Sequence, residues 1–448
     1  MAISSTRLRF SPLVEIVARE ASHLTFGVAR KRTFRVEVAR GNLTRALDIL
    51  NSTGATEDEL LALAARDGGL AGASSMAYLV GCFTQLQLLV YLWSIDETDH
   101  ACIVPCTPVF RLAGSSCAGD ESAVLSRFAY LRRIGDQLTL ESPASQCRIE
   151  LLTPDSAAWL HSLSTKGRMP CGAPLQFADL LRCTGFLESD EGGKLLPQSF
   201  WEFHDRLFHC YTRGLLSRST FRFAGTAESA PPAVKGPMSV TRICLPIPDL
   251  AALKQQSDDL LSVMERRQSN HGHYGTTPPL TQLGEFLFRV ARVKRLASGM
   301  HQEVVFRPFP SAGAIHEIDF YIAIVSPEAG LSGLFHYHGV EHALYRLPAT
   351  HDAVCALLKE ACPNFAVPCL VILSSRHARI AWKYEGIAYR LTLMNAGSVI
   401  QSMYLVATDM GLACCALGTG NTESFARASG LDTFDEPSIA EFILAQSL

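Results

Sequence analysis

The sequence has no dominant charge of either sign. Its 448 residues include 40 Lys and Arg and 43 Asp and Glu, for a formal net charge of -3. Proteins that hold nucleic acid by its phosphates need a strong basic excess, so we expect no nucleic-acid partner. Apolar residues make up 48% of the chain, enough to build the cores of the two or three domains that this length predicts.

The sequence also lacks a long apolar run without polar interruptions. Residues 1–20 contain no sustained apolar stretch, so we expect no signal peptide. The longest apolar run, residues 76–93, is interrupted by Thr84, Gln85 and Gln87. Because of these polar residues we expect a buried helix there and no membrane span.

Paired cysteine motifs and dinucleotide-binding glycine turns are absent. The 14 cysteines are scattered, and the Cys102–Cys106 pair has no second pair to complete a zinc site. Scattered thiols in a long chain are typical of a reduced, cytoplasmic protein. No Gly-x-Gly-x-x-Gly turn follows a strand pattern, so no Rossmann cofactor site is predicted.

The histidines form no metal motif. His336 and His338 share one face of a predicted strand, with His342 beyond the turn, but no acidic or cysteine ligands accompany them. His204 and His209 are five residues apart on a predicted helix, so they do not share a face. We therefore expect no metal site.

The first half of the chain contains two similar blocks. Residues 1–115 contain an alternating strand pattern and a helix that starts in a Thr56–Glu59 capping box and should end at Gly68-Gly69. Residues 120–225 contain strand patterns separated by turns, followed by short helical patterns. We interpret each block as a winged-helix-like module.

The second half reads as one further domain behind a linker. Residues 226–240 are rich in Pro, Gly, Ala and Ser, which is typical of a linker, and a similar break falls at 112–121. Residues 241–448 alternate helical and strand patterns, and segments 317–325 and 366–374 are continuous apolar strands expected to be buried on both faces. The sequence therefore predicts an α+β domain there.

A dense turn of small residues, Pro310, Ser311, Ala312 and Gly313, leads into the first of these strands. Prolines keep the entry rigid, and a glycine lets a flat polar group approach the backbone closely. An ordinary turn before a strand has the same composition, so this motif alone does not decide.

Arg266, Arg267 and Ser269 lie close together near the start of the same domain. Two guanidinium groups and a hydroxyl at this spacing can form a forked phosphate clamp. Arginine pairs are also common on solvated faces, so a plain surface turn is the open alternative.

Six motifs occur in one order along this domain, and together they resemble a known family. The set is similar to the C-terminal flavin domain of SagB-type dehydrogenases, which are nitroreductase-fold, FMN-dependent azoline oxidases of thiazole/oxazole-modified peptide biosynthesis. The resemblance covers about Asp258 to the C-terminus and extends more loosely to residues 125–152 and 201–209. The six motifs are residues 264–275, 283–295, 306–324, 333–347, 382–420 and 429–444.

The resemblance implies a role for individual residues. Lys383 and Tyr384 match the catalytic Lys-Tyr pair of the family, and Arg289 matches a further position that an ion pair would also explain. The implied FMN-binding residues, from the phosphate contacts to the ring edge, are Arg266, Arg267, Ser269, Pro310, Ser311, Ala312, Gly313 and Arg390. Backbone N–H groups of the Pro-Ser-Ala-Gly turn can then face flavin N5 or a flavin carbonyl.

The chemistry of azoline oxidation fits this catalytic pair. Oxidising a thiazoline removes a proton from Cα and a hydride from the adjacent ring carbon, and the hydride goes to flavin N5. Desolvation favours the neutral form of an amine, which can then accept the proton. The resemblance thus makes Lys383 the base, with Tyr384 orienting the ring or relaying the proton; without the ordered motifs, such a pair is usually a surface feature.

The sequence departs from the family in two places. Asn270 and His271 stand where another basic residue usually follows, so His271 is the candidate replacement contact to the phosphate. Residues 395–398 read Asn-Ala-Gly-Ser where the family often has Glu-Ala-Gly-His, and Gln401-Ser402 replaces Gln-Asn. The substrate-side and dimer contacts of this helix therefore stay open.

The resemblance implies oxidation of peptide thiazolines or oxazolines by a homodimer, with flavin reoxidation by dioxygen and a separate cyclodehydratase as partner. The front modules would hold the leader of an azoline-containing precursor peptide by strand addition, or would only brace the enzyme. Two alternatives remain: a generic nitroreductase-type flavin enzyme acting on small molecules, and a non-catalytic scaffold subunit of a peptide-modifying synthetase.

Overall fold

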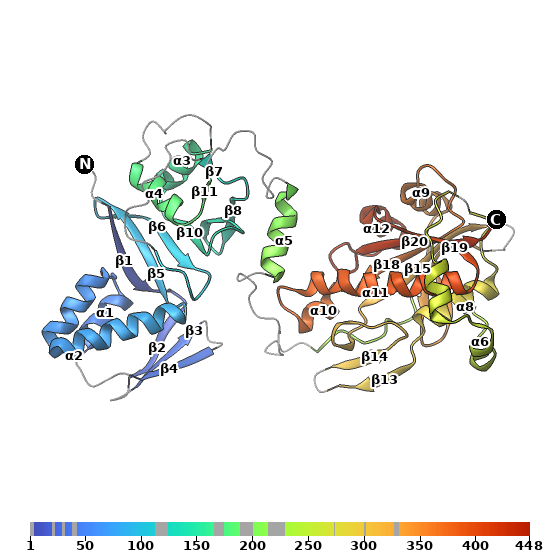
Figure 1. Ribbon diagram of the computed structural model, residues 1–448, viewed down its shortest axis with the longest axis horizontal. Coiled ribbons are helices and arrows are strands. Elements are labelled where there is room, and N and C mark those ends of the chain that lie inside the picture. The colour runs from blue at the N-terminus through green and yellow to red at the C-terminus, as the bar shows by residue number, and fades with distance from the viewer. Residues whose placement is uncertain are drawn as a thin grey trace. The chain divides into compact units, whose positions relative to one another are not determined.

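The computed structural model divides into two compact units, Met1–Ser217 and Arg218–Leu448 (Figure 1). The residues that it describes are 4–19, 23–28, 32–37, 43–112, 124–164, 174–188, 200–213, 229–272, 274–299, 302–326 and 331–448.

The front unit is organised around a six-stranded antiparallel sheet. In order across the sheet, its strands are β1 (Ser4–Phe10), β5 (Leu89–Ile95), β6 (Thr98–Pro105), β10 (Cys147–Leu151), β9 (Gln137–Glu141) and β8 (Tyr130–Ile134). Because β6 pairs with β10, the two expected modules share one sheet, and their winged-helix assignment is not confirmed. Residues 113–121 of the expected break lie outside the described part of the chain.

Two apolar cores lie against this sheet. In the first, the rings of Phe10, Phe26 and Phe83 pack with centroids 5.1–5.5 Å apart. In the second, Trp93 packs against Phe177, with ring centroids 5.6 Å apart. The other elements of the unit are β2 (Val14–Arg19), β3 (His23–Val28), β4 (Arg32–Glu37), α1 (Thr44–Asn51), α2 (Glu57–Gln85), β7 (Val124–Leu125), α3 (Pro154–Ser162), α4 (Leu175–Cys183), β11 (Leu187–Glu188) and α5 (Phe203–Arg213).

Helix α2 confirms one expectation and corrects two. The Thr56–Glu59 capping box is present, with Glu59 N donating to Thr56 Oγ1 at 3.2 Å and Thr56 N donating to Glu59 Oε2 at 2.9 Å. Gly68 and Gly69 interrupt the helix, since Gly69 has φ 61° and ψ -154°, but the helix resumes and runs to Gln85. The apolar run 76–93 is therefore not one buried helix: it begins as the last part of α2, turns at Gln87 with φ 56°, and ends in β5.

The rear unit contains a seven-stranded sheet whose neighbouring strands are all antiparallel. In order, its strands are β12 (Arg242–Cys244), β17 (Ala343–Arg346), β16 (Leu331–His338), β15 (Ile318–Ser326), β18 (Cys369–Ser375), β20 (Ser438–Gln446) and β19 (Leu412–Leu417). The remaining elements are α6 (Leu250–Gln256), α7 (Leu260–Arg266), α8 (Leu280–Ala291), the hairpin β13 (Arg295–Ser298) and β14 (Glu303–Phe306), η2 (Ala312–Ala314), α9 (His351–Ala361), α10 (His377–Lys383), α11 (Ala388–Asp409) and α12 (Thr422–Ser429).

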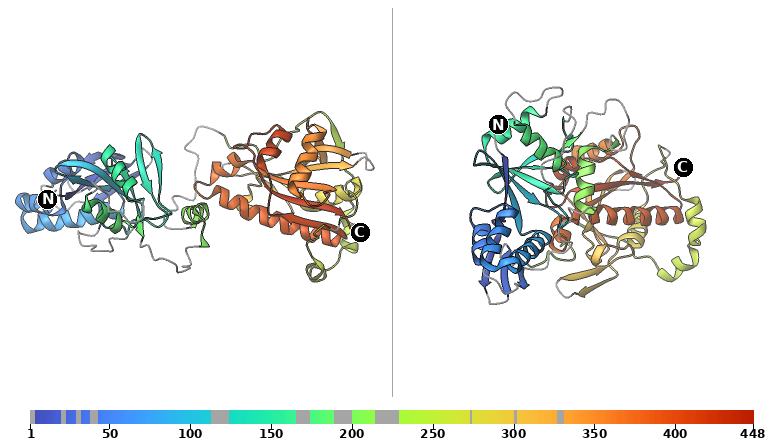
Figure 2. Two further views of the ribbon diagram at one scale, coloured as in Figure 1. Left: turned by 90° about the horizontal axis from the view of Figure 1, so that it is seen from above. Right: turned by 60° about the vertical axis from the view of Figure 1, so that its left-hand side comes forward.

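Helices cover both faces of this sheet, as Figures 1 and 2 show. On β15, Phe320 and Ile322 face the core under α8 and α11, whereas Tyr321 and Ala323 face the core under α9 and α12. This explains why the strand is apolar without alternation. The α+β class predicted for this part of the chain is confirmed.

The segment expected as a linker includes residues packed against the rear unit. Lys235 Nζ donates to Glu436 Oε2 at 2.6 Å and to the Tyr321 hydroxyl at 2.9 Å. Residues 226–228 of that segment lie outside the described part. The carbonyls of residues 231–233 also accept hydrogen bonds from the Arg376 and Arg379 side chains, so residues 231–235 form a strap held against the rear unit.

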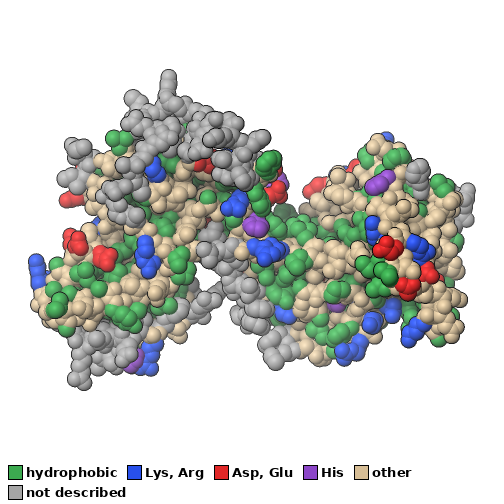
Figure 3. Space-filling model, viewed as in Figure 1, with side chains coloured by type: hydrophobic (Ala, Val, Ile, Leu, Met, Phe, Trp, Pro, Cys, Tyr) green, Lys and Arg blue, Asp and Glu red, His purple; other side chains and the backbone are tan. Residues whose placement is uncertain are grey.

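On the face shown in Figure 3, basic and acidic side chains are interspersed among apolar ones, in keeping with the small net charge. Among the helices in the described ranges, none combines the length and the apolar character needed to cross a bilayer.

Candidate functional site

The site is built on the bend that the sequence singled out, between β14 and β15. Gly313 has φ 61°, and two non-glycine residues beside it, Ala314 and His316, have φ 55° and 47°. Left-handed backbone at non-glycine residues is costly and is kept where the surroundings enforce it, often at functional sites. The bend is not packed shut, because Pro310 and Gly313 are exposed.

The bend leaves two backbone donors, the N–H groups of Ser311 and Gly313, without a hydrogen-bond partner among the described residues. Its other amide groups are bonded: Ala312 N to Asn395 Oδ1 (3.0 Å), Ala314 N to Ser311 O (3.1 Å), Ile315 N to Ala312 O (3.3 Å) and His316 N to Ser311 Oγ (3.0 Å). An exposed, rigid N–H next to a glycine fits the edge of a flat ring that bears acceptors.

Helix α10 brings the predicted catalytic pair to this bend. A Cβ built on Gly313 would lie 2.6 Å from Lys383 Nζ and 2.5 Å from the Tyr384 hydroxyl. Both side chains are half-buried, and Lys383 Nζ lies 5.4 Å from the centroid of the Tyr384 ring. Burial, and secondarily the carboxylate of Glu317, raises the pKa of Tyr384, so its phenol stays protonated at neutral pH.

A buried network below the bend was not predicted from the sequence. Asn395 Nδ2 donates to Glu317 Oε1 at 3.0 Å and to Ser311 Oγ at 3.1 Å, while its Oδ1 accepts from Ala312 N. Glu317 is completely buried. The departure at Asn395 thus places an amide that bonds a backbone N–H and a carboxylate together, which a Glu side chain could not do without protonation.

The three residues predicted to contact the FMN phosphate do not all lie together in the structure. Ser269 Oγ lies 2.8 Å from the Tyr404 hydroxyl, and the Arg267 guanidinium lies over the Tyr404 ring at 5.4 Å. Arg266 is exposed and pairs with Asp258. The structure therefore gathers Arg267 and Ser269 around Tyr404, which the sequence did not single out, and turns Arg266 to another partner.

The two halves of the site lie along one helix. Asn395 and Tyr404 both belong to α11, and at 1.5 Å per residue they are separated by roughly 13 Å along its axis. Arg390 lies half-buried in the first turn of α11. Arg289 instead pairs with Asp409, which identifies it as an ion-pair partner.

Histidines and cysteines form no metal centre in the described ranges, where no group of three potential ligands occurs. His336 and His338 are buried on β16, and His342 Nδ1 bonds the Tyr337 hydroxyl at 2.9 Å. His271 is exposed, with Nδ1 3.8 Å from Cys415 Sγ.

Two protein-family models match the chain. The nitroreductase family matches residues 280–443, and the cyanobactin oxidase ThcOx matches residues 123–217, a range that contains both loosely similar upstream motifs.

The individual proteins that this chain is similar to share low sequence identity with it. A Methanocaldococcus jannaschii protein assigned to the nitroreductases, MJ1384, is 26% identical over 175 residues, which are 38% of this chain and 82% of that protein. The E. coli microcin synthetase McbBCD complex with truncated pro-MccB17 bound is 15% identical, with a TM-score of 0.36, over 58% of this chain and 84% of the matched chain. An FMN complex of a protein assigned to the nitroreductases, from Desulfovibrio desulfuricans, is 13% identical, with a TM-score of 0.28, over 42% and 87%. The two structural likenesses are too low to carry an argument.

Proposed function

We propose, on the premise that this chain is of the SagB type within the nitroreductase superfamily, that it oxidises peptide thiazolines or oxazolines to thiazoles or oxazoles with FMN as cofactor. The observation that carries the proposal is the meeting of Lys383 and Tyr384 with the glycine of the exposed bend. Residues some seventy positions apart in sequence converge there on the space that a ring would share with them.

The chain's own residues divide the work. Lys383 Nζ accepts the proton that leaves Cα of the azoline, while the neutral Tyr384 phenol orients the ring by donating a hydrogen bond. The N–H groups of Gly313 and Ser311 would hold the flavin ring edge, and Arg267 with Ser269 would hold the phosphate. When bound, FMN would supply the hydride acceptor, and its reoxidation would deliver two electrons and two protons to dioxygen, which leaves as hydrogen peroxide.

Exposed apolar side chains beside the bend support a homodimer. On α11, the helix bonded to the bend through Asn395, Leu393 and Met394 are 41% and 57% exposed. Leu260 and Leu261 on α7 add further exposed apolar surface. A second copy that covers these residues would exclude water from the cofactor, which a hydride transfer requires.

The front unit supports a peptide substrate. On the outer edge of β1, Leu8 forms two backbone hydrogen bonds with Ala55: Leu8 N donates to Ala55 O at 2.8 Å, and Ala55 N donates to Leu8 O at 3.1 Å. By alternation, Thr6 directs its N–H and C=O outward, and within the described residues these groups have no partner. Such an edge can accept an extended peptide as an added strand.

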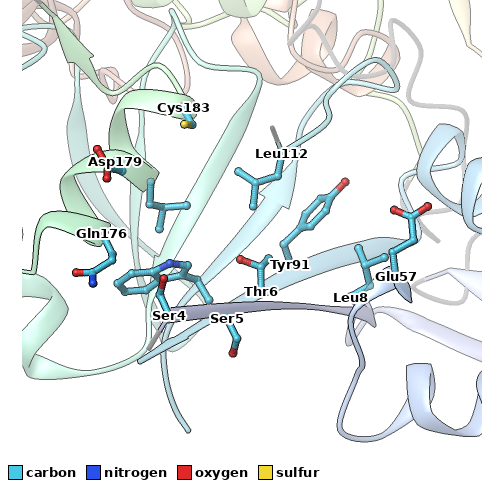
Figure 4. A pocket seen from close by; sticks show the side chains of 12 residues that line it. Ser4, Ser5, Thr6, Leu8, Glu57, Tyr91, Leu112, Gln176, Asp179 and Cys183 are labelled. Atoms are coloured by element: carbon cyan, nitrogen blue, oxygen red, sulfur yellow. The ribbon is translucent and has the colours of Figure 1, made fainter. Parts of the chain in front are cut away.

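A pocket of about 360 Å³ lies beside this edge, with β1 along one side and α4 along another (Figure 4). Among its described lining residues, Glu57 and Asp179 are acidic, and none is Lys or Arg. We assign the edge and pocket to the leader of the precursor peptide, with a basic side chain in the pocket. The azolines would come from a cyclodehydratase, the expected partner enzyme.

The experiment is mass spectrometry of an azoline-bearing peptide after incubation with the full-length protein. Aromatisation lowers the peptide mass by about two daltons per ring, because one proton and one hydride leave. Lys383→Ala should keep bound flavin but lose at least 100-fold of the oxidation rate, within the range of general-base contributions. Lys359→Ala, at an exposed lysine on α9, is the matched control and should change nothing.

The same samples separate the alternatives. A yellow protein that reduces small nitroaromatics and leaves azolines unchanged is a generic nitroreductase. A colourless protein that binds a cyclodehydratase is a scaffold. Near-normal azoline turnover by Lys383→Ala removes Lys383 from the mechanism.

A further inference from the structure

Helix α10, which ends at Lys383, is only seven residues long. Helices of this length are unstable alone, because nucleation is costly and few bonds follow it. What holds α10 against the bend therefore decides where the Lys383 amine and the Tyr384 hydroxyl lie.

Arg379 lies one turn before Lys383 on this helix and is completely buried. Its guanidinium donates to three backbone carbonyls from three different segments: Nε to Ile315 O at 2.8 Å, Nη1 to Pro231 O at 2.6 Å and Nη2 to Glu303 O at 2.9 Å. These carbonyls belong to the residue that ends the bend, to the strap and to the first residue of β14. One side chain thus fixes α10 to three separate backbone segments.

The acceptors make this arrangement unusual. Burial and the nearby Arg376 lower the pKa of Arg379 to about 10, so the guanidinium stays charged at neutral pH although it bonds only neutral carbonyls. A planar fork with five donors can bind separate carbonyls at once, which an ammonium group cannot do with the same geometry.

An apolar contact fastens the same two elements a second time. Ile380, the neighbour of Arg379, packs with Ile315 and Ala388, and Tyr384 packs against that cluster. Ile315 is therefore held to α10 through its carbonyl and through its side chain. The distance from the bend to the end of α10 depends on this joint.

We infer that Arg379 is a positioning residue that holds Lys383 and Tyr384 against Gly313. It touches neither substrate nor ring, and acts through α10 and the bend. Its role in turnover rests on the function proposed above, whereas its role in holding α10 does not.

Arg376 provides the matched comparison. It lies three residues earlier and bonds the same strap, through Pro232 O at 2.7 Å and Ala233 O at 2.9 Å, and it pairs with Asp319. Within the described residues, its side chain makes no hydrogen bond to the bend, although its backbone N–H donates to Glu317 O, just after the bend, at 3.0 Å. If these two arginines serve stability alone, variants of Arg376, which is half-buried, and of Arg379 should behave alike.

The experiment compares Arg379→Lys and Arg376→Lys in the full-length, FMN-loaded protein. Hydrogen exchange followed by mass spectrometry is the first readout, and it needs no activity. Arg379→Lys should raise exchange at least tenfold in residues 377–384 and 312–316 together, while Arg376→Lys should raise it mainly near residues 232–233. Equal exchange in the two variants would overturn the inference.

Turnover is the second readout. Arg379→Lys should lower kcat at least tenfold, with KM and flavin content within about twofold of the parent, whereas Arg376→Lys should keep kcat within twofold. If the two variants differ in exchange as expected but the parent protein oxidises no azoline, the proposed function is contradicted, whereas the role of Arg379 in holding α10 against the bend is supported. If Arg379→Lys does not fold, Ile380→Val weakens the same joint, and unchanged exchange in residues 377–384 of that variant would overturn the inference.

Discussion

At the scale of single residues, Gly313 offers the most direct test of the site. Gly313→Ala adds a Cβ where Lys383 Nζ and the Tyr384 hydroxyl already lie within 2.6 Å, and it imposes a left-handed conformation on a residue with a side chain. We expect at least a tenfold loss of azoline oxidation and a loss of about 1–2 kcal/mol in the free energy of unfolding. Steady-state kinetics and urea unfolding measure the two effects.

Gly411 separates backbone strain from crowding. It has φ 67°, close to that of Gly313, but nothing lies within 4 Å of a Cβ built there. Gly411→Ala should therefore lose similar stability and keep its activity. If Gly313→Ala and Gly411→Ala lose activity equally, the close approach of Lys383 and Tyr384 to Gly313 is not what the activity depends on.

Glu441, on β20, predicts how the rear unit responds to pH. Its side chain is 7% exposed and lies against Gly420 in a small cavity lined by Leu357, Leu370 and Ile372. Burial raises its pKa from 4.5 to about 7. Because this pKa is higher in the folded than in the unfolded protein, protonation of Glu441 stabilises the folded state. The stabilisation by protonation is fully present below pH 4.5 and is lost as the pH rises through about 7.

The variant Glu441→Gln removes this titration. At about 1.4 kcal/mol per pKa unit, the charged carboxyl costs on the order of 3 kcal/mol above pH 7, so the variant should be more stable than the parent at pH 8. Urea unfolding at pH 5 and pH 8 measures the difference. Glu360→Gln, on the rim of the same cavity, is the control; the same gain in both variants at pH 8 would contradict the assignment to Glu441.

At the scale of elements, local signals were predicted from the sequence and non-local ones were not. The capping box at Thr56 depends on neighbours within a few residues, and it is present. The prediction of one buried helix over residues 76–93 was wrong because apolar residues alone do not distinguish a helix from a buried strand. The pairing of Leu370 with Ile443, which places β18 beside β20, leaves no trace in either segment alone.

The same limit applies to the elements of the candidate site. The bend and the Lys-Tyr segment were singled out by their residue types and their order along the chain. Arg379 and Glu317 were not, because their partners are backbone carbonyls or an amide from distant segments. Arg266 and Arg267 are adjacent in sequence, and what distinguishes them is their partners in the fold, Asp258 for Arg266 and Tyr404 for Arg267.

At the scale of the whole molecule, the strap decides where the rear unit can be separated from the front one. A chain of residues 229–448 keeps Pro231–Lys235 and should fold with flavin. A chain of residues 241–448, which follows the boundary expected from composition, removes both carbonyl acceptors of the Arg376 side chain, one of the three carbonyl acceptors of Arg379, and the Lys235 partner of Glu436. Each buried group left without a partner costs about 1–3 kcal/mol, so this chain should be unfolded or aggregated, as circular dichroism and sedimentation would show.

The 229–448 chain then tests what the front unit contributes. If the β1 edge holds the leader, removing the front unit should lower kcat/KM at least tenfold for a leader-bearing peptide and less than twofold for a short azoline, because all the proposed catalytic residues belong to the rear unit. Thr6→Pro in the full-length chain removes the outward N–H at the edge and should reproduce part of the selective loss. Equal losses for both substrates would mean that the front unit only braces the enzyme, since a docking edge is used by the long substrate alone.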